Sequence, residues 1–298
     1  MLPQAVPGST DGSYNDGMIR LAFSTNAFKK QSLAEAIDTI AAIGYRGVEI
    51  MADVPHAHPA SFDAAARRAL KRQLAACGLQ VSNVNAFTHF ADGDTYHPTW
   101  IEDDPALREL RIRHTLGAIE LAAELEAKSV SIQPGGPLIG TGLSREQAEE
   151  RFAEGLDRIE DHAQKYDIAI AIEPEPGLLI ECASEYLAFK NRYFRTEPSV
   201  RMNCDIGHLF CVGDDPSEVI RAIPDEIVHV HLEDIAANRV HQHLAPGKGV
   251  IDFRAVFAAL EQVCYTGWVT VELYPYETTA AEVAQIAWQY LMRILEEA

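Results

Sequence analysis

The sequence predicts an α/β protein that folds as a single closed (β/α)8 barrel. Eight short apolar segments alternate with eight helical segments, and no long polar linker interrupts them. Strands that alternate with helices form parallel sheets, and eight such units in 298 residues match the size of a closed barrel. An open doubly wound sheet is the rival fold. Its nucleotide-binding form loses its main support because no Gly-x-Gly-x-x-Gly segment follows the first strand.

Each expected strand is a short run of aliphatic and β-branched residues with turn-forming residues beside it. The run over 228–234 alternates apolar and polar residues, so that His229, His231 and Glu233 share one face. A strand face made of histidine and carboxylate indicates contact with a metal or a substrate, although a lone histidine is more often a hydrogen-bonded core residue. The strands are expected at residues 21–27, 47–51, 80–86, 129–133, 168–173, 200–205, 228–234 and 268–273.

The expected helices carry start and stop signals. Ser32 and Glu35 have the spacing of a capping box, and Gly78 follows an amphipathic segment as a stop signal. Pro105 and Pro216 each follow an aspartate at a helix start. The helices are expected at residues 32–44, 63–77, 104–128, 144–166, 183–193, 215–223, 252–264 and 279–298.

Composition restricts the partners and the compartment. Residues 1–18 are rich in Gly, Pro and Ser and predict a flexible extension, which leaves residues 19–298 as the barrel domain. The chain shows no signal peptide and no run of roughly 20 apolar residues, so we expect no membrane span. A net charge of −19 argues against nucleic acid and anionic membranes as partners. Five scattered cysteines without a Cys-x-x-Cys pair indicate a reducing cytoplasm.

Four consecutive strands of the second half each present a carboxylate or an imidazole near their carboxyl end. These residues are Glu173, Asp205, His231 and Glu272. Each alone could be structural, as a salt-bridged residue or a helix cap. Together they predict a metal site, because chemistry in this fold lies at that end and buried carboxylates are costly unless a cation compensates them. The ligand set favours one Mn²⁺, with Mg²⁺, Co²⁺ or Zn²⁺ as alternatives.

Several motifs connect these residues to a known family. They are Ile172-Glu173-Pro174, Asp205-Ile206-Gly207-His208, His229-Val230-His231-Leu232-Glu233-Asp234, Pro246-Gly247-Lys248-Gly249 and Gly267-Trp268-Val269-Thr270-Val271-Glu272. On these motifs the chain resembles the sugar phosphate isomerase/epimerase superfamily of xylose isomerase-like TIM barrels over residues 19–297. That group includes ketose 3-epimerases, inosose dehydratases and, more distantly, the endonuclease IV repair enzymes.

The resemblance implies roles for individual residues. Glu173, Asp205, His231 and Glu272 would be the metal ligands, and the two glutamates would also act as general acid and base on opposite faces of a sugar. His208 would match a histidine that contacts substrate oxygens. These roles are expectations from the family and do not follow from the spacing alone.

The chain also departs from the family pattern. Ketose epimerases place Asn-Arg soon after the ligand histidine, whereas Arg239 lies further along in this chain. His241 and His243 stand where endonuclease IV has an Asp-x-His pair, and Gln133 replaces one of its zinc-binding histidines. We carry over Arg239 and His243 as substrate contacts and add Glu233, which shares a strand face with His231.

The expected function is therefore a divalent-metal-dependent isomerase or epimerase of a sugar, keto-sugar or cyclitol. Its proton transfer would pass through a metal-stabilised enediolate. Loss of a β-hydroxyl from the same enediolate would instead give a lyase, either inosose dehydratase-like or C-glycoside-cleaving. An endonuclease IV-like hydrolase and a non-catalytic binding barrel are weaker alternatives. Barrels of this kind often pair through their helical faces, which makes a homo-oligomer a candidate assembly, although the sequence does not fix the oligomeric state.

Overall fold

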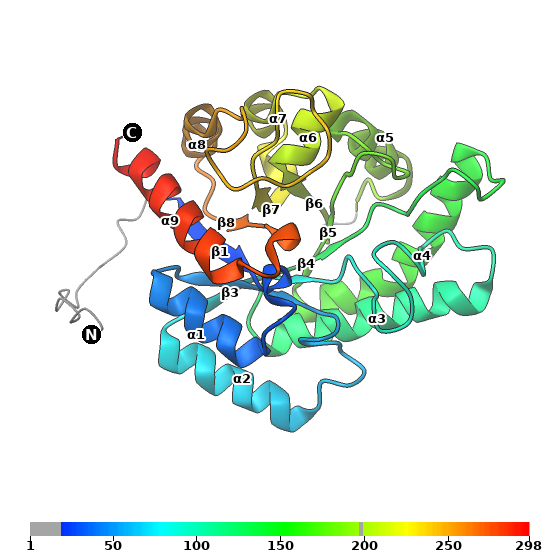
Figure 1. Ribbon diagram of the computed structural model, residues 1–298. Helices are drawn as coiled ribbons and strands as arrows, with labels where there is room; N and C mark the ends of the chain where they lie inside the picture. The colour runs from blue at the N-terminus through cyan, green and yellow to red at the C-terminus, as the bar shows by residue number, and fades with distance from the viewer. Residues whose placement is uncertain (1–18, 197–198, 298) are drawn as a thin grey trace, which may run out of the picture.

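The computed structural model describes residues 19–196 and 199–297, and Figure 1 shows strands gathered at the centre with helices around them. The extension predicted over residues 1–18 lies outside the described residues. All neighbouring strands are parallel, and β8 pairs with β1 to close the barrel, which confirms the predicted fold class. The strands are β1 (Arg20–Ser24), β2 (Gly47–Met51), β3 (Gln80–Asn85), β4 (Ser129–Ile132), β5 (Ala169–Ile172), β6 (Val200–Asp205), β7 (Ile227–Leu232) and β8 (Trp268–Val271).

The helices form the outer layer, as Figure 1 shows, and each of the eight predicted helices begins close to its expected start. The predicted capping box at Ser32 is present, and Gly78 ends its helix in the left-handed conformation. No helix of the described part is long and apolar enough to cross a membrane. The α-helices are α1 (Leu33–Ile43), α2 (Ala64–Cys77), α3 (Pro105–Glu124), α4 (Arg145–Tyr166), α5 (Ala183–Tyr193), α6 (Ile206–Val212), α7 (Pro216–Ala222), α8 (Phe253–Gln262) and α9 (Ala280–Glu296). Short 3₁₀ helices are η1 (Thr25–Phe28), η2 (Pro224–Glu226) and η3 (Tyr274–Tyr276).

One α-helix of the described residues was not predicted. α6 has only seven residues, and a glycine and a valine lie among them, so it carries no clear helical period. Asp205, the last residue of β6, caps it by accepting a hydrogen bond from the backbone N of His208 at 2.8 Å. This helix therefore starts at the carboxyl end of a barrel strand and places its first turn at the mouth.

The apolar core lies between the strands and the helices. Phe23 of β1 packs against Phe28 and Tyr45, with ring centroids 5.8 and 5.4 Å away. Tyr45 extends this layer to α9, where its hydroxyl donates to the carbonyl of Ala284 at 3.1 Å. Since neighbouring residues of a strand point to opposite faces, this apolar layer leaves the other face of each strand for the barrel lumen.

The lumen below the mouth is polar. Asn83 of β3 donates to Glu49 of β2 at 2.9 Å and to Ser131 of β4 at 2.8 Å, and Ser129 donates to Asn83 at 2.7 Å. All four side chains are buried. Barrel interiors are usually filled by branched apolar residues, so this hydrogen-bonded layer is a departure that calls for a functional explanation.

Candidate metal centre and pocket

The structure brings together the four residues that the strand ends predicted as ligands. Glu173 and Glu272 directly follow β5 and β8, Asp205 ends β6, and His231 lies opposite Asp205 in the register of β6 and β7. One ligand atom from each lies within 4.8 Å of the others. Nδ1 of His231 is 3.0 Å from Glu173 Oε1 and 3.8 Å from both Asp205 Oδ2 and Glu272 Oε1.

The donor set fits a divalent cation. Oε2 of Glu173 and Oδ2 of Asp205 are buried and have no hydrogen-bond partner among the described residues. Buried carboxylate oxygens without a partner are costly, and a shared cation would compensate them. Burial raises the pKa of Glu272 to about 8, and the carboxylates of Glu173, Glu49 and Asp205 add to the shift, which shows an excess of negative charge.

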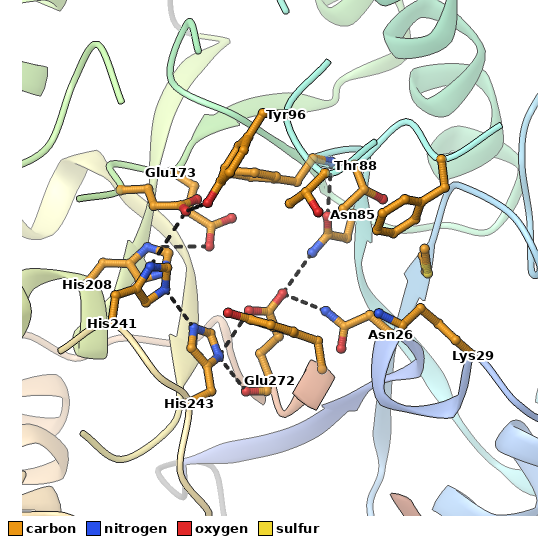
Figure 2. A pocket seen from close by; sticks show the side chains of 16 residues that line it. Asn26, Lys29, Asn85, Thr88, Tyr96, Glu173, His208, His241, His243 and Glu272 are labelled. Atoms are coloured by element: carbon orange, nitrogen blue, oxygen red, sulfur yellow. Dashed lines mark hydrogen bonds and ion pairs between the residues drawn. The ribbon is translucent and has the colours of Figure 1, made fainter. Parts of the chain in front are cut away.

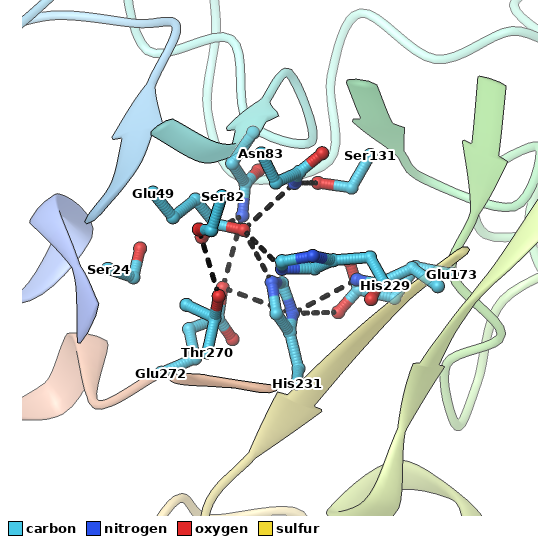
Figure 3. A network of polar contacts seen from close by, with 12 residues as sticks. Ser24, Glu49, Ser82, Asn83, Ser131, Glu173, His229, His231, Thr270 and Glu272 are labelled. Carbon is cyan, nitrogen blue, oxygen red and sulfur yellow. Dashed lines mark hydrogen bonds and ion pairs between the residues drawn. The ribbon is translucent and has the colours of Figure 1, made fainter. Parts of the chain in front are cut away.

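A carboxylate that the sequence analysis missed supports the imidazole from the lumen side. Figure 3 shows His231 between Glu49 and Glu173, and Nε2 of its ring is 2.6 Å from Glu49 Oε2. Burial alone would favour neutral forms of both groups. The mutual attraction outweighs burial, so the pKa of Glu49 lies well below its usual range and that of His231 lies well above it. His229 lies two residues before His231 in β7, and its Nε2 is 3.4 Å from the same oxygen, Oε2 of Glu49.

Two asparagines orient Glu272. Asn26, which follows β1, donates to Oε1 of Glu272 at 2.8 Å, and Asn85 at the end of β3 donates to the same atom at 3.2 Å. Asn85 also donates to Glu49 at 3.2 Å, so it links the two carboxylates. The sequence analysis did not single out either asparagine, although their positions at strand ends were the available signal.

A pocket opens above these groups. Its volume is about 220 Å³, and Figure 2 shows Glu173 and Glu272 entering it from different sides. Asp205 and His231 are not among its lining residues, so they lie beneath its floor. The lining residues are Asn26, Lys29, Met51, Asn85, Phe87, Thr88, Phe90, Thr95, Tyr96, Glu173, Glu175, His208, His241, His243, Glu272 and Tyr274.

Two of the predicted substrate contacts, His208 and His243, line this pocket. His208 in α6 donates through Nδ1 to the carbonyl of Pro174 at 3.0 Å, which fixes its ring. His243 donates through Nδ1 to the carbonyl of Glu272 at 3.0 Å, and its Nε2 is 3.2 Å from Nε2 of His241. Burial lowers the pKa of His243 to about 3 and that of His241 to about 4, so both rings are neutral near pH 7.

The other two predicted substrate contacts do not line the pocket. Glu233 is fully buried behind Asp205, with its carboxylate packed on Gly207, where an added Cβ would lie 1.6 Å from Oε1. Arg239 is exposed, and its guanidinium lies over the ring of Phe210 at 4.5 Å and donates to the Phe210 carbonyl at 3.0 Å. The left-handed backbone of Arg239, with φ of 57°, turns this loop residue outward.

Tyr96 and Glu175 form a second pair of groups that line the pocket, and the sequence analysis did not single out Tyr96. The hydroxyl of Tyr96, from the segment after β3, donates to Oε1 of Glu175 at 2.8 Å. Burial raises the pKa of Glu175 to about 7. Gln133 donates to the backbone carbonyl of Tyr96 at 3.0 Å and so holds this wall in place.

The fold and the candidate site define a (β/α)8 barrel with a carboxylate–histidine cluster at the carboxyl ends of four consecutive strands. The family model of the xylose isomerase-like TIM barrels matches residues 37–293, and the chain belongs to this family.

Curated proteins that the chain is similar to in sequence include inosose dehydratases and an epimerase. An inosose dehydratase of Lacticaseibacillus casei is 25% identical over 94% of this chain and 93% of its own length. The L-ribulose-5-phosphate 3-epimerase UlaE of Salmonella paratyphi C is 28% identical over 82% and 83%. The solved structure of the IolI protein with a bound zinc atom superposes with a TM-score of 0.76 at 19% identity, over 94% of this chain and 99% of that chain.

Proposed function

We propose that this protein is a divalent-metal-dependent isomerase or epimerase that acts on a sugar, keto-sugar or cyclitol. The observation that carries the proposal is the placement of Glu173 and Glu272. Both line the pocket, enter it from different sides in Figure 2, and approach the same atom of His231 at 3.0 and 3.8 Å. Two carboxylates on different sides of one substrate are what a proton transfer between its two faces requires.

The residues divide the work as follows. A divalent cation held by Glu173, Asp205, His231 and Glu272 would supply positive charge that stabilises an enediolate. One of the two glutamates removes the proton next to the substrate carbonyl, and the other returns a proton on the opposite face. The amides of Asn26 and Asn85 hold Glu272 in position for this step.

His208 is proposed to bind a substrate oxygen. Its Nδ1 is committed to the carbonyl of Pro174, which leaves Nε2 as the ring atom available for contact with a ligand. His243 is committed in the same way to the carbonyl of Glu272. These two backbone hydrogen bonds support a role for both rings in orienting the substrate rather than in moving its proton.

The alternative is a lyase of the same family, and one pair of residues favours it. Loss of a β-hydroxyl needs a proton donor beyond the metal ligands. Tyr96 and Glu175 are hydrogen-bonded to each other, line the pocket and do not belong to the four-residue cluster. The match to inosose dehydratases supports the same alternative.

Isotope exchange tests the proposal. The metal-loaded protein is incubated in deuterated water with ketoses, inososes and 3-keto-glycosides, and exchange of the proton next to the carbonyl is followed by NMR. The proposal is supported if the wild type exchanges this proton and each of the variants Glu173→Gln and Glu272→Gln does not. A dehydrated product identifies the lyase, and no exchange across the panel overturns both.

Metal analysis separates the remaining alternatives. We propose one ion per chain, with Mn²⁺ preferred over Mg²⁺, Co²⁺ and Zn²⁺. Two or three zinc ions with cleavage of an abasic duplex would instead identify an endonuclease IV-like hydrolase. A non-catalytic barrel would bind no metal, and Glu272→Gln would leave its ligand affinity unchanged.

The compartment and the assembly are also proposals. All five cysteines are free, which supports a reducing cytoplasm. A homo-oligomer is proposed because barrels of this kind often pair through their helical faces. Analytical ultracentrifugation of the purified chain tests this proposal.

A further inference from the structure

We infer that the pocket takes an uncharged, phosphate-free polyol substrate and discriminates against phosphorylated sugars. This inference rests on the proposed function, since it names the substrate class of the same pocket. A phosphate group needs lysine or arginine side chains, or clustered backbone N–H groups, that are free to receive it. Around this pocket, carboxylates of the chain itself occupy the donors of both kinds.

The first occupied donor is Lys29. It is the one lysine or arginine among the lining residues of the pocket. Its Nζ is 2.8 Å from Oε1 of Glu277, and it also lies 5.4 Å from the ring centre of Phe90 and 5.9 Å from that of Tyr274. A phosphate would have to displace Glu277 while it approaches the carboxylates of the same pocket.

The second occupied donor is the glycine-rich loop after β7. In this fold the loops after the seventh and eighth strands often form a phosphate site. Here the backbone N–H groups of Gly247 and Gly249 donate to Oδ2 of Asp234 at 2.9 and 2.7 Å. Those of Ile251 and Ile235 donate to Oδ1 at 3.1 and 3.0 Å. The buried Asp234 carboxylate thus fills the position that an external anion would take.

The loop after β3 repeats this arrangement. Asp53, which is fully buried, accepts hydrogen bonds from the backbone N–H groups of Phe90 and Ala91 at 2.5 and 3.2 Å and from the Thr88 hydroxyl at 2.8 Å. Thr88 and Phe90 line the pocket. Their donors therefore point to an internal carboxylate.

The imidazoles do not replace a free cation. His208 lies 3.7 Å from Asp205 and 3.9 Å from Glu173, and His241 lies 3.7 Å from Glu175. Any positive charge on these rings is already balanced by a carboxylate of the chain. Arg239 and Lys248, in the loop after β7, are exposed and do not line the pocket.

The remaining lining groups suit neutral hydroxyls. The amides of Asn26 and Asn85 and the hydroxyls of Thr88 and Thr95 are uncharged. The Thr88 hydroxyl donates its proton to Asp53, but its oxygen can still accept a hydrogen bond from a polyol. The ring of Phe87 offers an apolar face to the carbon skeleton of a sugar. The other ionisable side chains that line the pocket besides Lys29 include the acidic groups Glu173, Glu175 and Glu272, none of which offers a positive charge to a phosphate.

The test compares matched pairs in deuterated water with the Mn²⁺-loaded protein. The pairs are D-fructose with D-fructose 6-phosphate and D-ribulose with D-ribulose 5-phosphate. We expect proton exchange for the uncharged member with a kcat/KM at least about 100-fold higher than for its phosphate ester, because the ester brings an unpaired charge into the site. Equal or faster exchange of a phosphate ester overturns the inference.

Two variants identify the cause. Glu277→Gln removes the carboxylate that pairs with Lys29. The kcat/KM ratio of uncharged sugar to phosphate ester should then fall by about 10-fold, because the freed ammonium can pair with the ester. Lys248→Gln should leave both rates unchanged. A loss of exchange with phosphate esters in Lys248→Gln would reveal a phosphate site in the glycine-rich loop and would contradict the inference.

A binding measurement keeps the two proposals separable. If no member of either pair exchanges, the proposed function fails for these sugars, and charge preference is then read from calorimetry with D-glucitol and D-glucitol 6-phosphate. Tighter binding of D-glucitol supports the inference. Equal or tighter binding of the phosphate ester overturns it.

Discussion

Glu49 holds the ring of His231 from below, with Oε2 of the carboxylate 2.6 Å from Nε2 of the imidazole. With Nε2 donating to Glu49, Nδ1 is the ring atom that faces Glu173, Asp205 and Glu272. Such a carboxylate fixes the tautomer of a ligand histidine and raises its basicity. Glu49 is therefore a positioning residue for the candidate metal site, although it does not line the pocket.

Glu49→Gln should weaken binding of the divalent ion by about 10–100-fold, because the amide no longer carries the charge that orients the imidazole. Titration of the metal against a competing chelator measures the affinity without any substrate. Glu160→Gln is the matched control, since Glu160 is a buried glutamate of α4 outside the pocket. Equal affinities of the wild type and Glu49→Gln would contradict this role.

Glu173→Gln and Glu272→Gln should each lower the rate of proton exchange by about 10²–10⁴, the usual contribution of a positioned acid or base. Exchange into a responsive ketose or inosose is followed by NMR at saturating metal. Because loss of a ligand also weakens the metal site, occupancy is measured in the same samples. A variant with full metal and an unchanged exchange rate would remove that glutamate from the mechanism.

Gly207→Ala should destabilise the protein, because a Cβ at this position would lie 1.6 Å from Oε1 of Glu233. Overpacking of this kind typically costs about 1–3 kcal/mol, and urea unfolding measures it. The double variant Gly207→Ala/Glu233→Ala removes the clashing carboxylate and should recover part of the loss. No recovery would mean that the strain arises elsewhere in α6.

Two buried histidines outside the candidate metal site, His89 and His114, should contribute a loss of stability below about pH 6.5. The rings of His58, His89 and His114 pack together with centroids 4.4–5.8 Å apart. Burial first, and the buried Arg111 second, lower the pKa of His89 and place that of His114 well below its usual range. Both rings bind a proton less readily in the native state than in the unfolded chain, where they take one up near pH 6.5.

The unfolded state therefore binds more protons below this pH, and each ring reduces the unfolding free energy by up to about 1.4 kcal/mol per pH unit. The charged groups that face the cluster are Arg111, Asp53 and Asp92. Urea unfolding at pH 7.5, 6.5, 5.5 and 5.0 should give a smaller pH slope for His114→Gln than for the wild type. Parallel slopes would show that His114 does not titrate between the two states.

The barrel and the four strand-end residues could be read from the sequence because both depend on local patterns. Alternation of strand and helix fixes the parallel order, and the carboxyl end of each strand then fixes the edge at which Glu173, Asp205, His231 and Glu272 meet. The preference for a particular metal depends on the donor atoms, and the residue types alone already specify those atoms.

The missed features depend on contacts between distant segments. Glu49 is a single polar residue in a strand that is buried throughout, and nothing near it in the chain indicates its partner, His231. α6 is too short to show a helical period, and its cap, Asp205, was already interpreted as a ligand. Arg239 has a left-handed backbone conformation, which is uncommon for residues other than glycine. Nothing in the sequence therefore indicated that this residue lies on the exposed side of its loop.

Asp205 uses its two carboxylate oxygens for different purposes. Oδ1 accepts the backbone N–H of His208 and starts α6, whereas Oδ2 is buried and has no hydrogen-bond partner in the described part of the chain. A cation at Oδ2 would not compete with the helix cap, and both would restrain the same side chain. Folding of α6 and assembly of the ligand set are then a single cooperative event, and slower hydrogen exchange of the α6 amides should report how much metal the protein holds.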